Sequence, residues 1–98
     1  MTDTVYEIAI CKLIPGSEAS AGREKAMAAV RAYPGFVRWK ALDCIEDPLL
    51  IADLVEWESL AHASAAGENV MKDPAFADYM GAIAEVVLMR HFTVKSTV

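Results

Sequence analysis

The chain has 98 residues, a formal net charge of −5 and a hydrophobic content of 55%. This length allows one domain, so we expect residues 1–98 to form a single unit. The apolar content exceeds the roughly 45–50% usual for soluble proteins, which excludes long-range disorder. No stretch free of Asp, Glu, Lys and Arg approaches the roughly 20 apolar residues of a spanning helix, so we expect no membrane association.

The beginning of the chain lacks the basic and apolar segments of a signal peptide, which predicts a cytoplasmic location. Cys11 and Cys44 are too few for a disulfide framework, and we expect buried or half-buried thiols. The nine basic residues are scattered along an acidic chain. Nucleic-acid binding needs clustered Lys and Arg, so we expect no nucleic-acid partner.

The first half of the chain alternates strand and helix signals. Residues 5–14 are rich in β-favouring side chains and predict a strand, which a Pro-Gly pair ends. A helix is predicted over 18–33, with Ser17 as its N-cap and a second Pro-Gly pair at its end. Residues 36–45 and 49–57 predict two strands joined as a hairpin.

The second half repeats the order of helix and strand. Ser59 is the expected N-cap of a helical region that runs to about residue 71. Asp73 and Pro74 restart a short helix, and residues 85–94 predict the last strand. The resulting order, β-α-β-β-α-β, is the ferredoxin-like pattern of the α+β class. It predicts a four-stranded antiparallel sheet with both helices on one face.

The predicted strands carry apolar residues on both of their faces. In 49–57, Leu50 and Leu54 lie on one face, and Ile51 and Val55 lie on the other. In 85–94 we expect Val86 to share a face with Leu88 and Phe92, opposite Val87 and Met89. Two helices cover only one face of a sheet, so the other face would expose a large apolar patch. We therefore predict an obligate homodimer formed through the sheet face.

Five short pieces of the chain carry a family resemblance. They are Pro-Gly-Phe at 34–36, Asp-Pro at 47–48, Glu-Trp-Glu-Ser at 56–59, Ala-His at 61–62 and Asp-Pro-Ala-Phe-Ala-Asp-Tyr at 73–79. In their order and spacing, the chain resembles the antibiotic biosynthesis monooxygenase-like family, whose protomers pair as a dimeric α+β barrel. Core anchors and turn residues also explain several of these pieces.

The resemblance implies a pocket between the sheet and the helices of each protomer. It also implies, as one candidate activity, oxidation of a small aromatic or quinol-like substrate by O2 without a cofactor. The alternative is a non-enzymatic, small-ligand-binding or stress-related dimer on the same scaffold, because a fold does not decide a function.

His62 is the candidate catalytic residue. Its ordinary pKa, about 6.5, suits acid–base work or hydrogen bonding near neutral pH. It lies in an Ala-rich helix at a position that is often polar in the family, whereas His91 ranks lower. The alternative is a His at the surface or at the edge of the core.

Four further residues are the candidate substrate-binding residues: Trp57, Tyr79, Asp53 and Arg38. The two aromatic residues suit pocket walls, although ordinary packing also explains them. Asp53 interrupts an apolar strand and needs a partner, which Arg38 or Lys40 can supply. The hairpin register leaves open which face Asp53 takes, and hence whether it is a pocket acid or a structural pair.

Metal and cofactor chemistry find no support in the residue pattern. The two His residues lack ligand spacing, so we expect no metal site. The haem-degrading branch of the superfamily relies on an Asn in the first strand and a His in the later helix. Here the only Asn is Asn69, and Met80 lies about where that His would fall, so we expect no cofactor.

Overall fold

The computed structural model describes residues 4–98. The described residues follow the predicted β-α-β-β-α-β order, with a 3-10 turn before the last helix. In chain order the elements are β1 (Val5–Leu13), α1 (Ala19–Val30), β2 (Phe36–Asp43), β3 (Leu50–Trp57), α2 (Leu60–Val70), η1 (Pro74–Phe76), α3 (Ala77–Gly81) and β4 (Ile83–Phe92). Within residues 4–98, no helix is long and apolar enough to cross a membrane.

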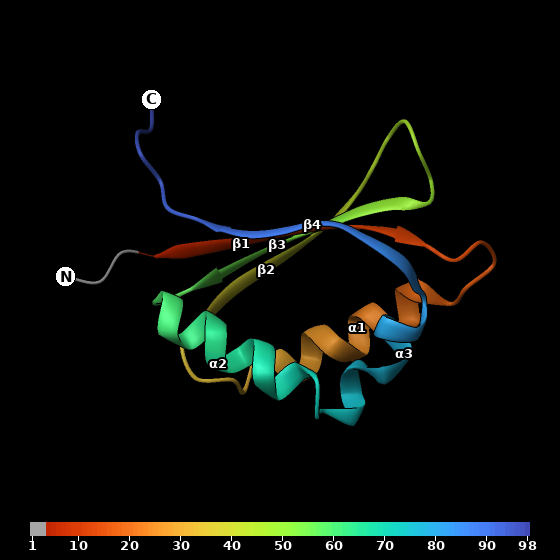
Figure 1. Cartoon of the computed structure of the whole chain (residues 1–98), viewed down its shortest axis with the longest axis horizontal. Helices are drawn as coiled ribbons and strands as arrows, with labels where there is room; N and C mark the ends of the chain where they lie inside the picture. The colour runs from red at the N-terminus through yellow and green to blue at the C-terminus, as the bar shows by residue number, and fades with distance from the viewer. Residues whose placement is uncertain (1–3) are drawn as a thin grey trace.

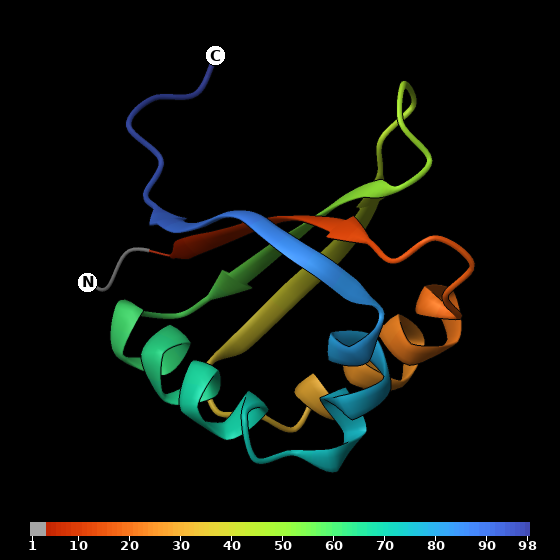
Figure 2. The same ribbon diagram turned by 45° about the vertical axis from the view of Figure 1, so that its right-hand side comes forward.

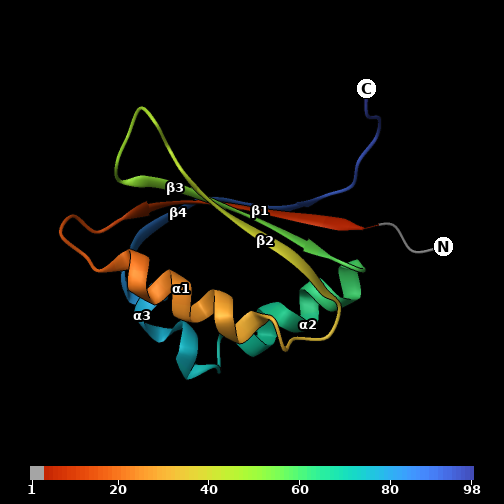
Figure 3. The ribbon, with the colours of Figure 1, turned by 180° about the vertical axis from the view of Figure 1, so that it is seen from behind.

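The four strands form one antiparallel sheet in the order β2-β3-β1-β4. All helices lie against one face, and the opposite face is bare (Figures 1 and 3). The β2–β3 hairpin and the segment after β4 both rise on the bare side (Figure 2). The predicted α+β ferredoxin-like fold is therefore confirmed for the single chain.

Local hydrogen bonds explain where the helices begin. Ser59 and Asp73 cap α2 and η1 as predicted, and each accepts a hydrogen bond from a backbone N–H of the first turn. The predicted cap of α1 is wrong, because Glu18 occupies the N-cap position without a side-chain hydrogen bond. Ser17 therefore lies outside the helix, and α1 ends at Val30 rather than near residue 33.

The core lies between the helices and the covered face of the sheet. It is built from apolar side chains of both layers: Cys11, Ala26, Val30, Ile51, Val55, Trp57, Ala63, Ala66, Phe76 and Tyr79. Gly22 lets α1 approach α3 closely, since a Cβ there would lie 2.8 Å from the Tyr79 backbone nitrogen. This close approach holds the Tyr79 ring beneath the sheet.

A bulge in β4 changes the face of one predicted residue. Leu88 pairs with Ile10, but the next pair along β1 is Cys11 with Val86, so one residue of β4 is skipped. Val86 consequently shares the helix-facing side with Cys11, and the expectation that it lies with Leu88 is wrong. Val86 and Met89 both reach the space between the layers.

Candidate functional site

A cavity of about 250 Å³ lies between the sheet and the helices. Its floor comes from β1 and β3, and its walls come from α2, η1, α3 and β4. The lining is largely apolar, and its rim includes the exposed side chains of Met71, Met80 and Val86. The polar groups that reach it are Glu7, Trp39, Asp53, Trp57 and Tyr79. Such a site, apolar with a few placed polar groups, is typical of small-molecule pockets.

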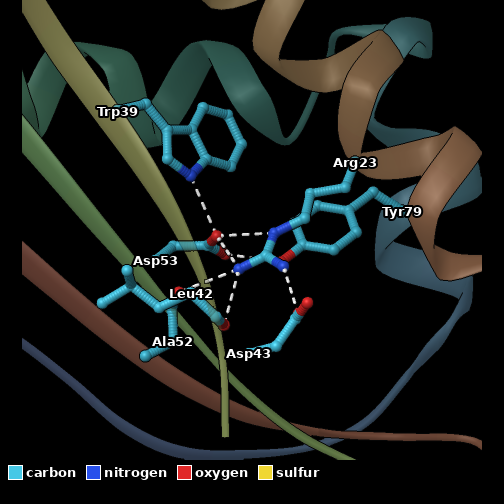
Figure 4. Close-up of polar contacts among 7 residues, drawn as sticks. All are labelled: Arg23, Trp39, Leu42, Asp43, Ala52, Asp53 and Tyr79. Atoms are coloured by element: carbon cyan, nitrogen blue, oxygen red, sulfur yellow. Dashed lines mark hydrogen bonds and ion pairs between the residues drawn. The ribbon is translucent and has the colours of Figure 1, made fainter.

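Asp53 lies at the centre of a buried hydrogen-bond network (Figure 4). Its Oδ1 accepts hydrogen bonds from Arg23 Nε at 2.9 Å and from Arg23 Nη2 at 2.7 Å. Trp39 Nε1 donates to the same oxygen at 2.9 Å, and the Tyr79 hydroxyl donates to Oδ2. The guanidinium compensates the carboxylate charge, and Asp53 is only 6% exposed.

Both terminal nitrogens of Arg23 have further partners. Nη2 donates to the backbone carbonyls of Leu42 at 3.3 Å and Ala52 at 2.8 Å, and Nη1 contacts Asp43 at 3.3 Å. Burial raises the pKa of Tyr79, and Asp53 raises it further, so this hydroxyl stays a donor. The network is thus a closed set of partners that ties α1 and α3 to the centre of the sheet.

Glu7 projects from β1 onto the same face as Asp53. In the β1–β3 register Glu7 lies opposite Val55, so Asp53 and Trp57 are its two diagonal neighbours. Burial raises the pKa of the Glu7 carboxyl above its ordinary value. His91 and the Trp57 indole N–H lower it in part, and Asp53 adds to the rise. The Glu7 carboxyl in this position therefore binds a proton more tightly than a solvent-exposed Glu does.

Trp57 carries the one buried side-chain N or O atom that lacks a hydrogen-bond partner among residues 4–98. This atom is the indole Nε1, and the residue is only 3% exposed. Buried donors are nearly always satisfied, so an orphaned N–H in a cavity wall points to a ligand acceptor. The N–H lies near enough to the Glu7 carboxyl to lower its pKa, but the contact does not meet hydrogen-bond geometry, and both groups line the same cavity.

Three of the predicted site residues meet at this cavity. Asp53, Trp57 and Tyr79 all line it, and the register places Asp53 on the helix-facing side. The cation that partners Asp53 is Arg23 from α1, which corrects the expectation of Arg38 or Lys40. The two remaining candidates, His62 and Arg38, lie elsewhere.

His62 lies at the start of α2, outside the lining of the cavity. Its Nδ1 is 2.7 Å from the hydroxyl oxygen of Ser59, and its ring packs over Gly35. Gly35 has φ +78°, and a Cβ there would lie 2.2 Å from the ring. The geometry thus gives His62 a place in the junction between α2 and the start of β2, away from the cavity.

Arg38 lies on the bare face of the sheet. Its Nη1 is 3.3 Å from Glu56 Oε2, and its side chain is 59% exposed. The β2–β3 register pairs Arg38 with Glu56, one residue away from the cavity-facing Trp57. The side chain therefore cannot reach a ligand in this cavity from its own protomer.

The sequence analysis did not identify Glu7, Arg23 or Trp39 as site residues. For Glu7 and Arg23, the spacing of neighbouring apolar residues does indicate a buried position. Glu7 alternates with Val5 and Ala9 along β1, which places it on the covered face. Arg23 precedes Ala26 by three positions and Val30 by seven, which places it on the buried stripe of α1. In the sequence Trp39 resembles any aromatic strand residue, and no local pattern predicts its hydrogen bond with Asp53.

Within residues 4–98, no group of three or more His, Cys, Asp or Glu side chains is arranged to hold a metal ion. Both cysteines are free, with Cys11 buried and Cys44 half-buried, as predicted. Cys11 lines the cavity, and burial raises the pKa of its thiol.

Comparison with known proteins identifies the fold. No family model and no curated protein matches the chain. Among solved structures, a Bordetella bronchiseptica protein provisionally assigned as an antibiotic biosynthesis monooxygenase has a TM-score of 0.76 at 20% identity, over 94% of this chain and 97% of that one. A Chloroflexus aurantiacus protein with the same provisional assignment has a TM-score of 0.73 at 16% identity, over 97% and 96%.

A third structure has a described activity. SnoaB from Streptomyces nogalater, a cofactor-independent oxygenase, has a TM-score of 0.73 at 20% identity, over 98% of this chain and 97% of its own. Similarity at such low identity shows a shared fold. The resemblance inferred from the sequence is thus confirmed as a structural match over nearly the full length to proteins assigned as antibiotic biosynthesis monooxygenases.

Proposed function

We propose that the protein is a cofactor-independent oxygenase that acts on a small hydroxylated aromatic molecule in the cavity. Glu7 accepts the proton of the substrate hydroxyl, and Trp57 Nε1 donates a hydrogen bond to the oxygen that becomes negative. The observation that carries the proposal is the buried, unpartnered indole N–H of Trp57, which shares an apolar cavity with the Glu7 carboxyl. This assignment replaces His62 with Glu7 as the candidate base.

A hydroxyl group fits these two partners better than other common polar groups. It accepts a hydrogen bond from the Trp57 N–H and donates one to the Glu7 carboxylate at the same time. A carbonyl oxygen would satisfy only Trp57 while Glu7 is ionised. The largely apolar walls favour an aromatic frame for the remainder of the ligand. An apolar cavity of about 150 Å³ suffices for benzene, so this cavity has room for a substituted ring.

Deprotonation is the step that this geometry supports chemically. The aromatic oxyanion is a much stronger electron donor than the neutral phenol, and it can pass electrons directly to O2. For a hydroquinone, one oxygen atom enters the ring and the other leaves as water. The products are a hydroxyquinone and H2O, and the substrate supplies all four electrons. The Trp57 N–H stabilises the oxyanion where its charge develops.

Two further observations support the proposal. Burial and the nearby Asp53 raise the pKa of Glu7, and a base with a pKa nearer the operating pH is more effective. SnoaB, which is described as a cofactor-independent oxygenase, shares the fold over 98% of this chain.

Oxygen uptake with a panel of hydroquinones and one- or two-ring phenols tests the function. We expect turnover by the wild-type protein, with kcat reduced about 10²–10⁴-fold in Glu7→Gln. In Trp57→Phe, which keeps an aromatic ring but removes the donor, we expect a loss of about 10²–10³-fold. Glu68→Gln, on the exposed side of α2, is the matched control for removing a charge. No uptake with any member of the panel would contradict the proposal.

Binding without turnover is the second candidate function. One observation favours it: the Asp53 carboxylate is already engaged by Arg23, Trp39 and Tyr79, so it offers little free capacity for chemistry. Calorimetry with the same panel separates the two functions. Affinity that falls in Trp57→Phe, with no oxygen consumed by the wild-type protein, would establish a binding protein.

We also propose that a second copy of the chain covers the bare face of the sheet. Large apolar side chains gather there: Ile8, Ile10, Leu42, Leu54, Leu88 and Phe92. Leu42 and Phe92 are each 45% exposed, and no helix lies on this side (Figure 1). A typical stable interface buries about 800 Å² on each partner, which the face of such a sheet can supply.

Light scattering tests the dimer. We expect twice the monomer mass at micromolar concentration, and a shift toward monomer in Leu54→Lys, which places a charge in the middle of the face. Leu60→Lys is the matched control, because Leu60 is 55% exposed on α2, on the other side of the sheet. A wild-type monomer would contradict the proposal.

A further inference from the structure

His91 lies directly opposite Glu7 in the β1–β4 register. Its Nε2 is 3.6 Å from Glu7 Oε1. The Glu7 side chain is 16% exposed and lines the cavity, whereas the His91 side chain is 32% exposed and lies outside the lining. The pair therefore connects the cavity, which Glu7 lines, to the solvent, which His91 reaches from the edge strand β4.

We infer that His91 is a proton relay that carries to solvent the proton that Glu7 takes from a bound hydroxyl group. The inference rests on the function proposed above and adds a residue to it. His91 does not touch the substrate, so its role is to return Glu7 to the ionised state between turnovers. The separation of 3.6 Å is long for a hydrogen bond, but such contacts commonly shorten when substrate binds.

The surroundings of Glu7 favour this route over others. From β3 it faces Asp53, which is already paired with Arg23, and the N–H of Trp57, which has no capacity to accept a proton. From α3 the titratable group is Tyr79, whose hydroxyl already donates to Asp53. The α2 residues of the lining carry no ionisable side chain: Ala66, Gly67, Val70 and Met71. Among the lining and contacting groups, His91 is the acceptor with access to water.

The relay consists of two balanced proton transfers. In the first, the substrate O–H bond breaks, its electron pair stays on the substrate oxygen, and the proton binds the Glu7 carboxylate. In the second, the Glu7 acid gives the proton to the neutral His91 ring, and the resulting imidazolium releases it to water. An imidazole suits this transfer because one ring nitrogen can accept a proton while the other donates one.

The pH profile of His91→Gln tests the relay in the intact protein. We expect kcat to fall about 10–100-fold while KM stays within about twofold, because the substrate does not contact His91. The acid limb of the kcat profile should move to higher pH, since the ring lowers the pKa of Glu7 and glutamine does not replace its charge. Added imidazole should restore part of kcat. His62→Gln, which alters a His outside the cavity, is the matched control and should keep the wild-type profile.

A ¹³C titration of the Glu7 carboxyl provides a readout that needs no turnover. In His91→Gln we expect the pKa of Glu7 to rise above its wild-type value, and in His62→Gln we expect no change. Absence of oxygen uptake by the wild-type protein would contradict the proposed function. An active His91→Gln protein with unchanged kcat, or an unchanged Glu7 titration, would overturn the relay and leave the proposed function standing.

Discussion

Asp53 and Glu7 lie on neighbouring strands and on the same face of the sheet, yet their environments are opposite. Asp53 accepts hydrogen bonds from Arg23, Trp39 and Tyr79, so its lone pairs are occupied by partners within the chain. Glu7 faces the unpartnered indole N–H of Trp57, and its Oε1 lies 3.6 Å from Nε2 of His91. A saturated carboxylate anchors helices to the sheet, whereas an unsaturated one is available to a ligand.

The two carboxylates also differ in what their removal would leave behind. Without Asp53, the Arg23 guanidinium, with only 10% of its side chain exposed, would lose its buried counter-charge and keep only Asp43, whose side chain is 87% exposed. Without Glu7, the nearest cation is a partly exposed His that water can solvate. This difference predicts a structural role for Asp53 and a chemical role for Glu7. Substitution of each carboxylate tests the prediction.

The largest expected effect is a loss of stability in Asp53→Ala. Removing one partner of a buried ion pair typically lowers the free energy of unfolding by about 3–5 kcal/mol, because the other charge stays buried. Urea denaturation measures it. The exposed Lys25–Asp78 pair, 3.6 Å apart with side chains 60% and 70% exposed, provides the control. Asp78→Asn should change stability by less than about 1 kcal/mol. Similar effects at the two sites would contradict a structural role for Asp53.

The second prediction is that Glu7→Gln changes the pH dependence of stability. Burial raises the pKa of Glu7 in the folded state, so folding disfavours its ionised form. The wild-type protein therefore matches Glu7→Gln best at pH values below the ordinary carboxyl pKa, about 4.3. It loses stability relative to the variant as the pH rises through the higher folded-state pKa.

Urea denaturation at intervals from pH 4 to 8 measures this difference. The free energy of unfolding of Glu7→Gln minus that of the wild type should grow with pH and then level off. Glu68→Gln, which removes a charge from the exposed side of α2, serves to subtract the general effect of net charge. A constant difference for Glu7→Gln would show that Glu7 is as well solvated in the folded chain as in the unfolded one.

Local patterns were enough to predict the fold and part of the site. The order of the elements follows from strand and turn signals, and the caps at Ser59 and Asp73 follow from their short polar side chains. The face of Asp53 was not predictable, since a one-residue shift in the hairpin reverses it. The bulge that turns Val86 toward the cavity leaves no sequence signal either.

The polar partners were harder to predict than the elements, because they depend on how α1 docks on the sheet. Arg23 and Asp53 are 30 positions apart, and no local spacing connects them. Strand neighbours such as Arg38 were the natural candidates from sequence, but the register sends Arg38 to the bare face. His62 is conspicuous as one of two His residues, whereas the sequence signal for Glu7 is only its alternation with Val5 and Ala9 along β1.

The smallest expected effect is that of His62→Ala on turnover. His62 lies outside the cavity, so we expect kcat for hydroquinone oxidation to stay within about twofold of the wild type. The free energy of unfolding should fall by about 1 kcal/mol, since the hydrogen bond between the His62 ring and Ser59 is lost while the backbone cap remains.

Gly35→Ala offers an internal check, because its Cβ would meet the His62 ring. The cost of Gly35→Ala should therefore shrink in a His62→Ala background, although the positive φ at residue 35 keeps part of it. A tenfold loss of turnover in His62→Ala would instead restore His62 as the catalytic candidate and leave Glu7 as a second buried structural carboxylate.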